Sequence, residues 1–533
     1  MRRLLSLLLA LWLANPAFAQ VVGGEDLPNQ TREVVLFPGV PHLPGAVVDL
    51  NFAKGPPYYT KGATGPLSVS RASSKTCADL AGNWYTVGAN VLCRTNQGAL
   101  IEEARTNLIP CSGTVSCGAS PPSTYPTGVY VYDSSGVLTA SIAAVGVTNG
   151  LQTIDISLSG SPINGQYFAY FPASPATGLA TYGQTFTTSA AVSLVAGSAT
   201  NVSNVSLDTR EVSSSSGTLL DTITSVGNLT PSLNRFQLSH TILTPATYYA
   251  NSIIFIFFSG GPVNLTYRIA VPQLELNPNI SATVASAVKT ANGTGGTNGT
   301  AVYTVSGGTC STQPTLNVTW AAGVLTVNSV ANAGSCSVLP PSPATLAYAS
   351  GTATGWTGAT VTLTPTDYTA QGFATSPIIT TGSPATRAAD NISLPVSALS
   401  GSYSLYSIAS NEQPAATNLY NFPADLNDGT YNNDLGIIRS TGGASSTGRS
   451  SIAGSASYVF PGNTYTQNVS YKVTVYVTPS TLYGNYNNGT VYTVALAGTP
   501  TVNTLSVGSI LGASPWNGYV SRIAVAKSSL LPY

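Results

Sequence analysis

The densest group of charged side chains is Glu102, Glu103 and Arg105, within the segment GALIEEARTN at residues 98–107. Acid–base catalysis by two carboxylates needs both to face one cleft, about 5 to 10 Å apart, with one pKa raised. Adjacent residues point to opposite faces of a strand and diverge by about a quarter-turn on a helix. We therefore expect this group to be a structural joint and not a catalytic pair.

A second group of acids is Asp425, Asp428 and Asp434, in the segment DLNDGTYNND. Short-range carboxylates and amides with a glycine could wrap a calcium ion, which takes six to eight oxygen ligands. The spacing lacks the alternating pattern and the terminal glutamate of a helix–loop–helix calcium site, and an ordinary Asn/Asp/Gly turn explains it as well. Structural calcium is thus the one cofactor that the sequence suggests.

Hydrolase chemistry finds little support. No Glu-x-Asp-x-x-Glu string of a sandwich glucanase occurs, and the two histidines, His42 and His240, do not accompany a convincing Gly-x-Ser-x-Gly elbow. Only six cysteines and two histidines are present and no CxxC occurs, so a zinc site of the usual type is not expected. We predict that the protein is not an enzyme.

Sugar binding is the better-supported chemistry, because exposed Tyr and Trp rings can stack on the apolar face of a sugar. Aromatic residues in loops are more exposed than those in alternating strands, although packing in a core is the alternative for each. The four aromatic residues at 167–171 fall on both faces of one strand, so at least half of them should be core. The candidate ligand-binding residues are Trp356, Tyr483, Tyr486, Trp516 and Asn517.

The first nineteen residues have the pattern of a secretory signal peptide: Arg2 and Arg3, an apolar run of about ten residues, and a small-x-small end at Ala17-Phe18-Ala19. We expect a periplasmic, secreted or surface-attached protein that does not span a membrane. Six cysteines in an exported chain suggest disulfides, with fifteen pairings open. Proximity favours Cys77 with Cys93, Cys111 with Cys117, and Cys310 with Cys336.

Charged residues make up only 7% of the chain, and the formal net charge is zero. Nucleic-acid binding needs clustered Lys and Arg, so no nucleic-acid partner is expected. Short β-branched and aromatic runs alternate with Gly, Pro, Asn and Ser clusters, as in residues 128–132 (GVYVY), 166–171 (QYFAYF) and 471–477 (YKVTVYV). This spacing predicts an all-β protein built from antiparallel sandwiches.

Three motifs resemble a family of modular proteins common in prophages and bacterial genomes. They are Ser70-Arg71-Ala72-Ser73 with residues 100–108 (LIEEARTNL), residues 182–186 (YGQTF) with 272–276 (PQLEL), and residues 373–378 (FATSPI) with 386–390 (TRAAD). The resemblance implies an opening segment tied by Arg105 to a jelly roll like carbohydrate-binding modules of families 4 and 9. A concanavalin A-like sandwich follows. Two departures are the signal peptide and about ninety additional residues between Leu276 and Ala374.

The resulting expectation is tandem β-sandwiches, jelly roll plus concanavalin A-like, with an inserted small β domain. The expected partner is a glycan or cell-surface polysaccharide, and the alternatives are a purely structural envelope or appendage protein and a polysaccharide-active enzyme. Homo-oligomerisation is a further option, although no heptad or collagen-like segment occurs to enforce it. The expected segments are 1–19 (signal peptide), 20–48 (lead-in), 49–108 (opening segment), 109–278 (jelly roll), 279–371 (insertion) and 372–533 (concanavalin A-like).

Overall fold

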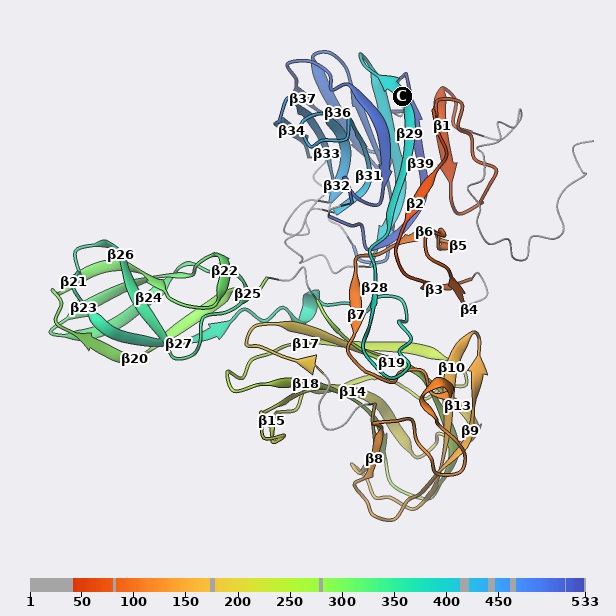
Figure 1. The fold of residues 1–533 in the computed structure, drawn as a ribbon, viewed down its shortest axis with the longest axis vertical. Coiled ribbons are helices and arrows are strands. Elements are labelled where there is room, and N and C mark those ends of the chain that lie inside the picture. The colour runs from red at the N-terminus through yellow and green to blue at the C-terminus, as the bar shows by residue number, and fades with distance from the viewer. Residues whose placement is uncertain are drawn as a thin grey trace, which may run out of the picture.

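A computed structural model describes residues 42–79, 83–172, 178–277, 281–412, 421–439, 446–460, 466–512 and 514–531. The predicted signal peptide lies outside these residues. The described chain consists of antiparallel β-strands and two single-turn 3₁₀ helices, η1 (Val115–Cys117) and η2 (Thr369–Gln371). Among the described residues, no helix is long and apolar enough to cross a membrane. The all-β prediction is confirmed, and Figure 1 shows two sandwiches, one above the other, with a smaller domain projecting to one side.

The jelly roll consists of two seven-stranded sheets. The sheet nearer the upper sandwich, here the junction sheet, contains β17 (Asn234–Thr241), β13 (Thr185–Gly197), β19 (Val263–Leu276), β10 (Leu151–Gly160) and β9 (Thr139–Thr148), extended by β7 (Arg105–Asn107) and β28 (Ala385–Arg387). The sheet away from that sandwich, here the aromatic sheet, contains β15 (Thr218–Leu220), β14 (Val202–Val212), β18 (Tyr249–Phe258), β11 (Tyr167–Phe171) and β8 (Tyr130–Asp133), with β12 (Gly178–Leu179) and β16 (Ile223–Gly227). Alternate residues such as Ile154, Phe168 and Ile256 point inward and fill the core between the sheets.

The upper sandwich combines both ends of the described chain. Its eight-stranded sheet contains β37 (Val491–Ala495), β36 (Thr481–Tyr486), β35 (Ser470–Val477), β30 (Tyr403–Asn411), β39 (Gly518–Ala526), β6 (Gly98–Ile101), β5 (Arg94–Thr95) and β1 (Ala46–Asn51). Its seven-stranded sheet, here the outer sheet, contains β2 (Ser68–Ser70), β29 (Asn391–Leu399), β38 (Val502–Val507), β31 (Asn421–Asn427), β32 (Asp434–Arg439), β33 (Ser446–Ile452) and β34 (Ser455–Val459). The opening segment thus supplies strands to both sheets.

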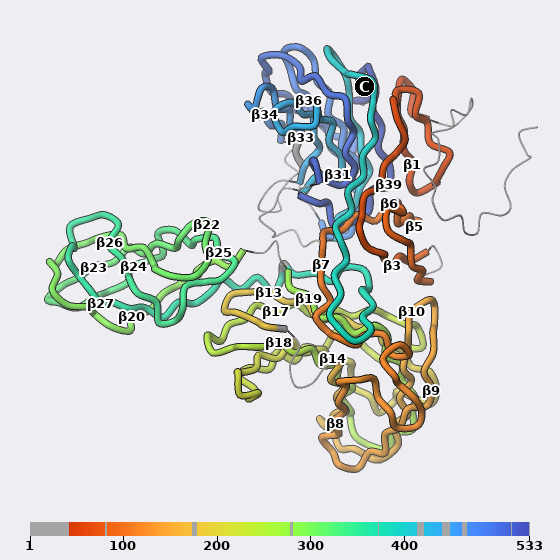
Figure 2. The backbone as a smooth tube through the Cα atoms, in the orientation of Figure 1, coloured from red at the N-terminus to blue at the C-terminus, as the bar shows by residue number. Residues whose placement is uncertain are grey.

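The first and last described strands, β1 and β39, pair with each other. In Figure 2, the red and blue ends of the tube run side by side. Asp49 is paired with Ala524, and Arg522, two residues away on β39, forms a bidentate ion pair with Asp49 at 2.8 and 2.6 Å. Two parallel N–H···O bonds of this kind fix geometry as well as adding energy. The first and last strands of the described chain are therefore held in one register.

The projecting domain, here the arm, has a six-stranded sheet of β20 (Val284–Thr294), β27 (Thr357–Pro365), β26 (Ala344–Gly351), β21 (Gly299–Val305), β23 (Thr315–Ala321) and β24 (Val324–Asn332). It has its own core around Tyr303, Val318 and Trp320. A short two-stranded sheet of β22 (Thr309–Thr312) and β25 (Ser335–Val338) lies at its base. A hairpin of β3 (Lys75–Ala78) and β4 (Trp84–Val87) lies beside the upper sandwich.

The three cysteine pairs that proximity favours are all disulfides in the structure. Cys77–Cys93 links two parts of the opening segment, and Cys111–Cys117 connects the end of η1 to the residues before it. Cys310–Cys336 links β22 to β25 in the arm. No described cysteine is free. The disulfide prediction is confirmed.

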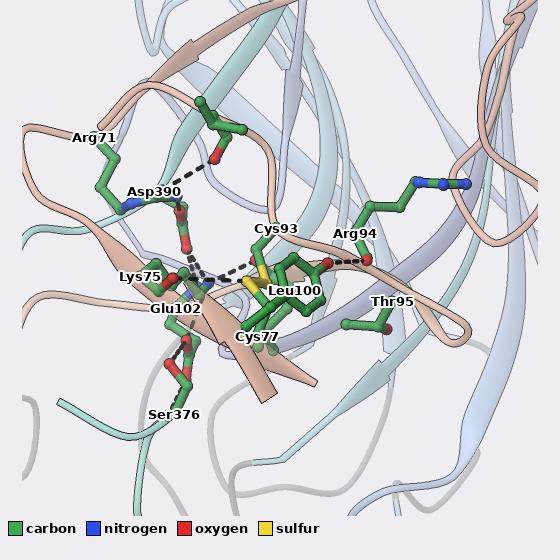
Figure 3. Close-up of a disulfide and its surroundings, with 12 residues drawn as sticks. Arg71, Lys75, Cys77, Cys93, Arg94, Thr95, Leu100, Glu102, Ser376 and Asp390 are labelled. Carbon is green, nitrogen blue, oxygen red and sulfur yellow. Dashed lines mark hydrogen bonds and ion pairs between the residues drawn. A yellow bond between two sulfur atoms is a disulfide. The ribbon is translucent and has the colours of Figure 1, made fainter. Parts of the chain in front are cut away.

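Five charged side chains with almost no exposed surface meet where the two sandwiches adjoin. Figure 3 labels Arg71, Lys75, Glu102 and Asp390 of this group. We call this group, Arg71, Lys75, Glu102, Arg387 and Asp390, the junction network. Asp390 accepts from Arg71 at 2.7 Å and from Lys75 at 2.5 Å, and Glu102 lies 3.0 Å from Lys75 and 3.2 Å from Arg387. The network joins residues more than 280 positions apart in the sequence.

The acid at the centre of the network is ionised. Burial alone would raise the pKa of Glu102, but Arg387, Lys75 and two hydrogen bonds from Ser376 lower it to about 2. The Ser376 N–H and hydroxyl donate to the two carboxylate oxygens at 2.6 and 2.7 Å. Both carboxylate oxygens of Glu102 thus bind groups from distant segments of the chain, which confirms the expected structural joint.

Asp390→Asn is expected to lower the free energy of unfolding of the upper sandwich by about 3–5 kcal/mol, because Arg71 and Lys75 would keep buried charges without a carboxylate between them. Calorimetric unfolding at pH 7 measures this change. The matched variant Asp367→Asn replaces an exposed aspartate of the arm's connection and should change stability by no more than about 0.5 kcal/mol. Equal effects of the two variants would contradict a central role for the network.

Candidate functional site

The structure places three of the five predicted ligand-binding residues inside the upper sandwich. Trp516 is 2% exposed and its indole N–H donates to Ser410 O at 2.8 Å, while Asn517 is fully buried and links to Glu103. Tyr486 is 8% exposed and packs on Tyr471. A buried side chain offers no surface to a sugar in solution, so burial argues against a ligand-binding role for these three residues. Loop composition suggested exposure, but each side chain turns into the body of the sandwich.

The other two predicted rings are half-buried, and each packs against a neighbouring aromatic ring. Trp356 stacks on Trp320, with ring centroids 5.3 Å apart, and its indole N–H donates to Thr297 O at 2.7 Å. Tyr483 packs against Tyr476 at 5.5 Å. The structure therefore scatters the five predicted residues over two domains and does not bring them together in one site.

Two of the three predicted calcium ligands lie close together, and the third lies in the loop between their strands. Asp425 and Asp434 lie buried on one face of neighbouring strands β31 and β32, and burial raises the pKa of both, to about 6 for Asp434. Asp428 lies in the following loop, where Thr430 and Asn433 donate to its two carboxylate oxygens. In the described part of the chain, no group of three or more His, Cys, Asp or Glu side chains could hold a metal ion. Calcium at these aspartates stays a prediction.

A group of six rings covers the outward face of the aromatic sheet. We call it the aromatic face, and it consists of Tyr130, Tyr132, Tyr167, Phe171, Phe255 and Phe257. Tyr130 packs on Phe171 with centroids 5.4 Å apart, and Tyr132 on Tyr167 at 6.2 Å. The geometry follows from the period of two in a strand, since residues two apart point to the same face.

Strand register gives the aromatic face its shape. Across the sheet, Tyr132 is opposite Ala169, which is opposite Phe255. Ala169 and Phe255 are almost fully buried, so the surrounding rings cover this row. Tyr130 and Tyr132 on the edge strand β8 are 50% and 44% exposed, which is high for tyrosines that pack against other rings. The two phenol rings are therefore available from solution.

A charged margin borders the rings on strand β14. The Arg210 guanidinium lies 5.6 Å from the centre of the Phe171 ring, a cation–π distance, and pairs with Asp221. Asp208, on the same face, is fully buried and lies 3.7 Å from Arg210. Burial, and then the neighbouring Asp221 charge, raise the pKa of Asp208 to about 7. The margin supplies hydrogen-bonding groups beside an aromatic platform.

Sequence reasoning missed this site although its signal was present. Tyr130 and Tyr132 stand two apart in GVYVY, and Tyr167 and Phe171 stand four apart in QYFAYF, so each pair shares a face. The alternating residues Phe168 and Tyr170 do enter the core. The strands were correctly expected to be half core, but their outward halves were not joined into one surface.

Comparison with known proteins adds no argument about the site. No protein-family model and no curated protein sequence matches the chain. Similar solved structures include the tandem CBM22 domains of Paenibacillus barcinonensis Xyn10C, with 10% identity, a TM-score of 0.23, and coverage of 80% of this chain and 98% of that one. Mouse laminin α1 domains LG4-5 share 8% identity over 68% and 84% of the chains, with a TM-score of 0.18. A truncated AlyQ with CBM32 and alginate lyase domains shares 9% over 75% and 98%, with a TM-score of 0.18.

Asp208→Asn is expected to make the free energy of unfolding less dependent on pH. An aspartate in an unfolded chain ionises near pH 3.9, whereas the raised pKa keeps Asp208 protonated to about pH 7 in the folded protein. The unfolded chain thus loses its proton first, and the wild type loses stability as pH rises from about 4 to about 7. The variant keeps an acceptor for the Thr222 N–H and cannot ionise.

Urea unfolding of both proteins at pH 4, 5.5 and 8, followed by circular dichroism, measures the difference. The free energy of unfolding of the variant, measured relative to that of the wild type, should rise by about 2 to 4 kcal/mol between the lowest and the highest pH. Parallel pH profiles would show that Asp208 is already ionised in the folded protein at low pH.

Proposed function

We propose that this chain is an exported, non-catalytic carbohydrate-binding protein that holds a glycan on the aromatic face of its jelly roll. The observation that carries the proposal is the pair Tyr130 and Tyr132, half-exposed on an edge strand and backed by Phe171 and Tyr167. Each phenol offers a flat apolar face with a polar rim. A pyranose ring has the matching pattern, because its C–H groups form apolar faces and its hydroxyls lie around the edge.

The polar margin supports the same ligand class. Strands β18 and β11 separate Arg210 on β14 from the tyrosines on β8, so Arg210 and the half-exposed Asp221 carboxylate are placed to bond hydroxyls of a neighbouring sugar residue of the same polysaccharide. The margin holds both charges, so it does not select a strongly charged polymer. The chain as a whole has no net charge, which supports a neutral polysaccharide over nucleic acid.

Export agrees with the disulfides. Three closed pairs are expected in an oxidising compartment and are rare in a reducing cytoplasm. Such a compartment is also where a protein would meet cell-surface polysaccharide. We include the signal peptide at residues 1–19 and a relation to tail-associated phage modules in this proposal.

A second candidate is a purely structural envelope or appendage protein, and the junction network favours it. Closely tied sandwiches make good spacers, and an oligomer of such chains would need no ligand. A polysaccharide-active enzyme is the third candidate, and release of reducing ends or unsaturated sugars from candidate polymers would reveal it. Glycan retention separates the first two candidates.

Tyr132→Ala is expected to weaken polysaccharide binding about tenfold, equivalent to about 1.4 kcal/mol, because one of the two half-exposed stacking rings would be lost. The mature chain is incubated with insoluble cellulose, chitin, xylan and peptidoglycan sacculi, and the bound fraction is measured as a function of polymer concentration. Tyr130→Ala should have a similar effect, and the double variant a larger one.

The matched control is Tyr492→Ala, which removes a tyrosine of similar exposure, 41%, from strand β37 of the other sandwich. This variant should bind as the wild type does. Retention on none of the four polymers would refute glycan binding by the chain. Equal losses in Tyr132→Ala and Tyr492→Ala would move the site away from the aromatic face.

A further inference from the structure

A cavity with a volume of about 250 Å³ lies between the jelly roll and the upper sandwich. Its lining comes from three parts of the chain that are distant in sequence. Trp84 belongs to the opening segment, Arg235 and Gln237 to strand β17 of the junction sheet, and Glu412, Gln467 and Tyr519 to the upper sandwich. Ligand sites are common at such domain interfaces. The volume is below the roughly 300 Å³ at which pockets for larger ligands begin, so it admits a single ring.

The charges around this cavity are already compensated. Glu102, at its inner side, is neutralised by Lys75 and Arg387. Arg235 donates to Thr375 O and, at 2.9 Å, to Ser189 Oγ, and the nearby carboxylates of Glu275 and Glu102 offset its charge. Burial, and then the nearby Glu102 charge, raise the pKa of Glu412 to about 7. An ion entering the cavity would lose water without finding an unpaired opposite charge, which disfavours charged ligands.

The groups that remain are aromatic rings and amides. Trp84 and Tyr519 are half-buried, and Gln237 is exposed at the mouth. Gln237 uses its oxygen to accept from the Ala374 N–H, and Gln467 uses its nitrogen to donate to Glu412 O. The Gln237 nitrogen and the Gln467 oxygen are left to provide one donor and one acceptor. Rings with amide partners suit a ligand that is apolar on its faces and hydroxylated at its edge.

We propose that this cavity is a second ligand site, for one uncharged, hydroxylated ring the size of a single sugar residue. The site is separate from the aromatic face, because β17 belongs to the junction sheet and Tyr130 and Tyr132 belong to the aromatic sheet. A ligand here touches both sandwiches at once. Its binding energy therefore adds to the stability of their junction, as for any ligand that binds only the folded state.

The test is calorimetric titration of the mature chain with glucose, galactose and N-acetylglucosamine, together with the charged rings glucuronate and glucosamine. At least one neutral sugar should bind saturably and raise the Tm, and the charged rings should bind at least tenfold more weakly. Gln237→Ala and Trp84→Ala should each weaken binding by tenfold or more. Gln237→Ala is decisive if Trp84→Ala does not fold, because Gln237 lies at the surface.

Two variants serve as controls. Gln313→Ala removes an arm glutamine that, like Gln237, makes one hydrogen bond to the backbone, and it should leave binding unchanged. Tyr132→Ala should lose polysaccharide retention while keeping the monosaccharide site. The proposal is overturned if no neutral sugar binds, if a charged ring binds best, or if Tyr132→Ala rather than Gln237→Ala abolishes monosaccharide binding. The last result would leave the aromatic face as the glycan site.

Discussion

The ion pairs of Lys75 and Arg71 with Asp390 determine how the molecule is assembled. Removing a charged side chain from water costs several kcal/mol, and only partners in good geometry offset this cost. Lys75 satisfies this condition with Asp390, Glu102 and the Leu100 carbonyl, all within 3.0 Å. Because a displacement of any member would leave a buried charge unpaired, the network tolerates one arrangement of the chain. We expect its main contribution to be specificity of assembly.

Hydrogen bonds of charged and neutral side chains next to the network connect it to both sandwiches. Arg105 donates to Asn277 Oδ1 at 2.7 Å at the end of β19, which confirms the tie to the jelly roll that the family resemblance implied. On the other side, Asn517 accepts from the Glu103 N–H at 2.8 Å and so connects the start of β39. The cavity proposed as a second site lies against these links. Of the motif residues that were expected to form a structural joint, Glu102 lines this cavity.

Sequence patterns that depend on local chemistry were read correctly. The turn-rich spacing predicted the all-β fold, and the short separation of the cysteines predicted their pairing. The side of the sheet on which each side chain lies was harder to predict. A strand with aromatic rings on both sides has no polar face that would identify the solvent-exposed side. Trp516 shows the opposite error, since its Asn-Gly neighbour suggested a surface loop while its indole is in the core. The pairing of β1 with β39 depends on contacts across more than 470 residues, which no local pattern encodes.

That pairing has a consequence for the order in which the protein matures. The upper sandwich needs β1, β2 and β6 from the beginning of the chain and β39 from its end, so it cannot close until the last strand has been synthesised. The jelly roll and the arm are built from intervening residues and can fold earlier. The early strands must meanwhile wait with unpaired edges, which slows folding and exposes them to proteases and to other chains. A chain truncated before Gly518 would lose a central strand of the upper sandwich and the partner of its own first strand.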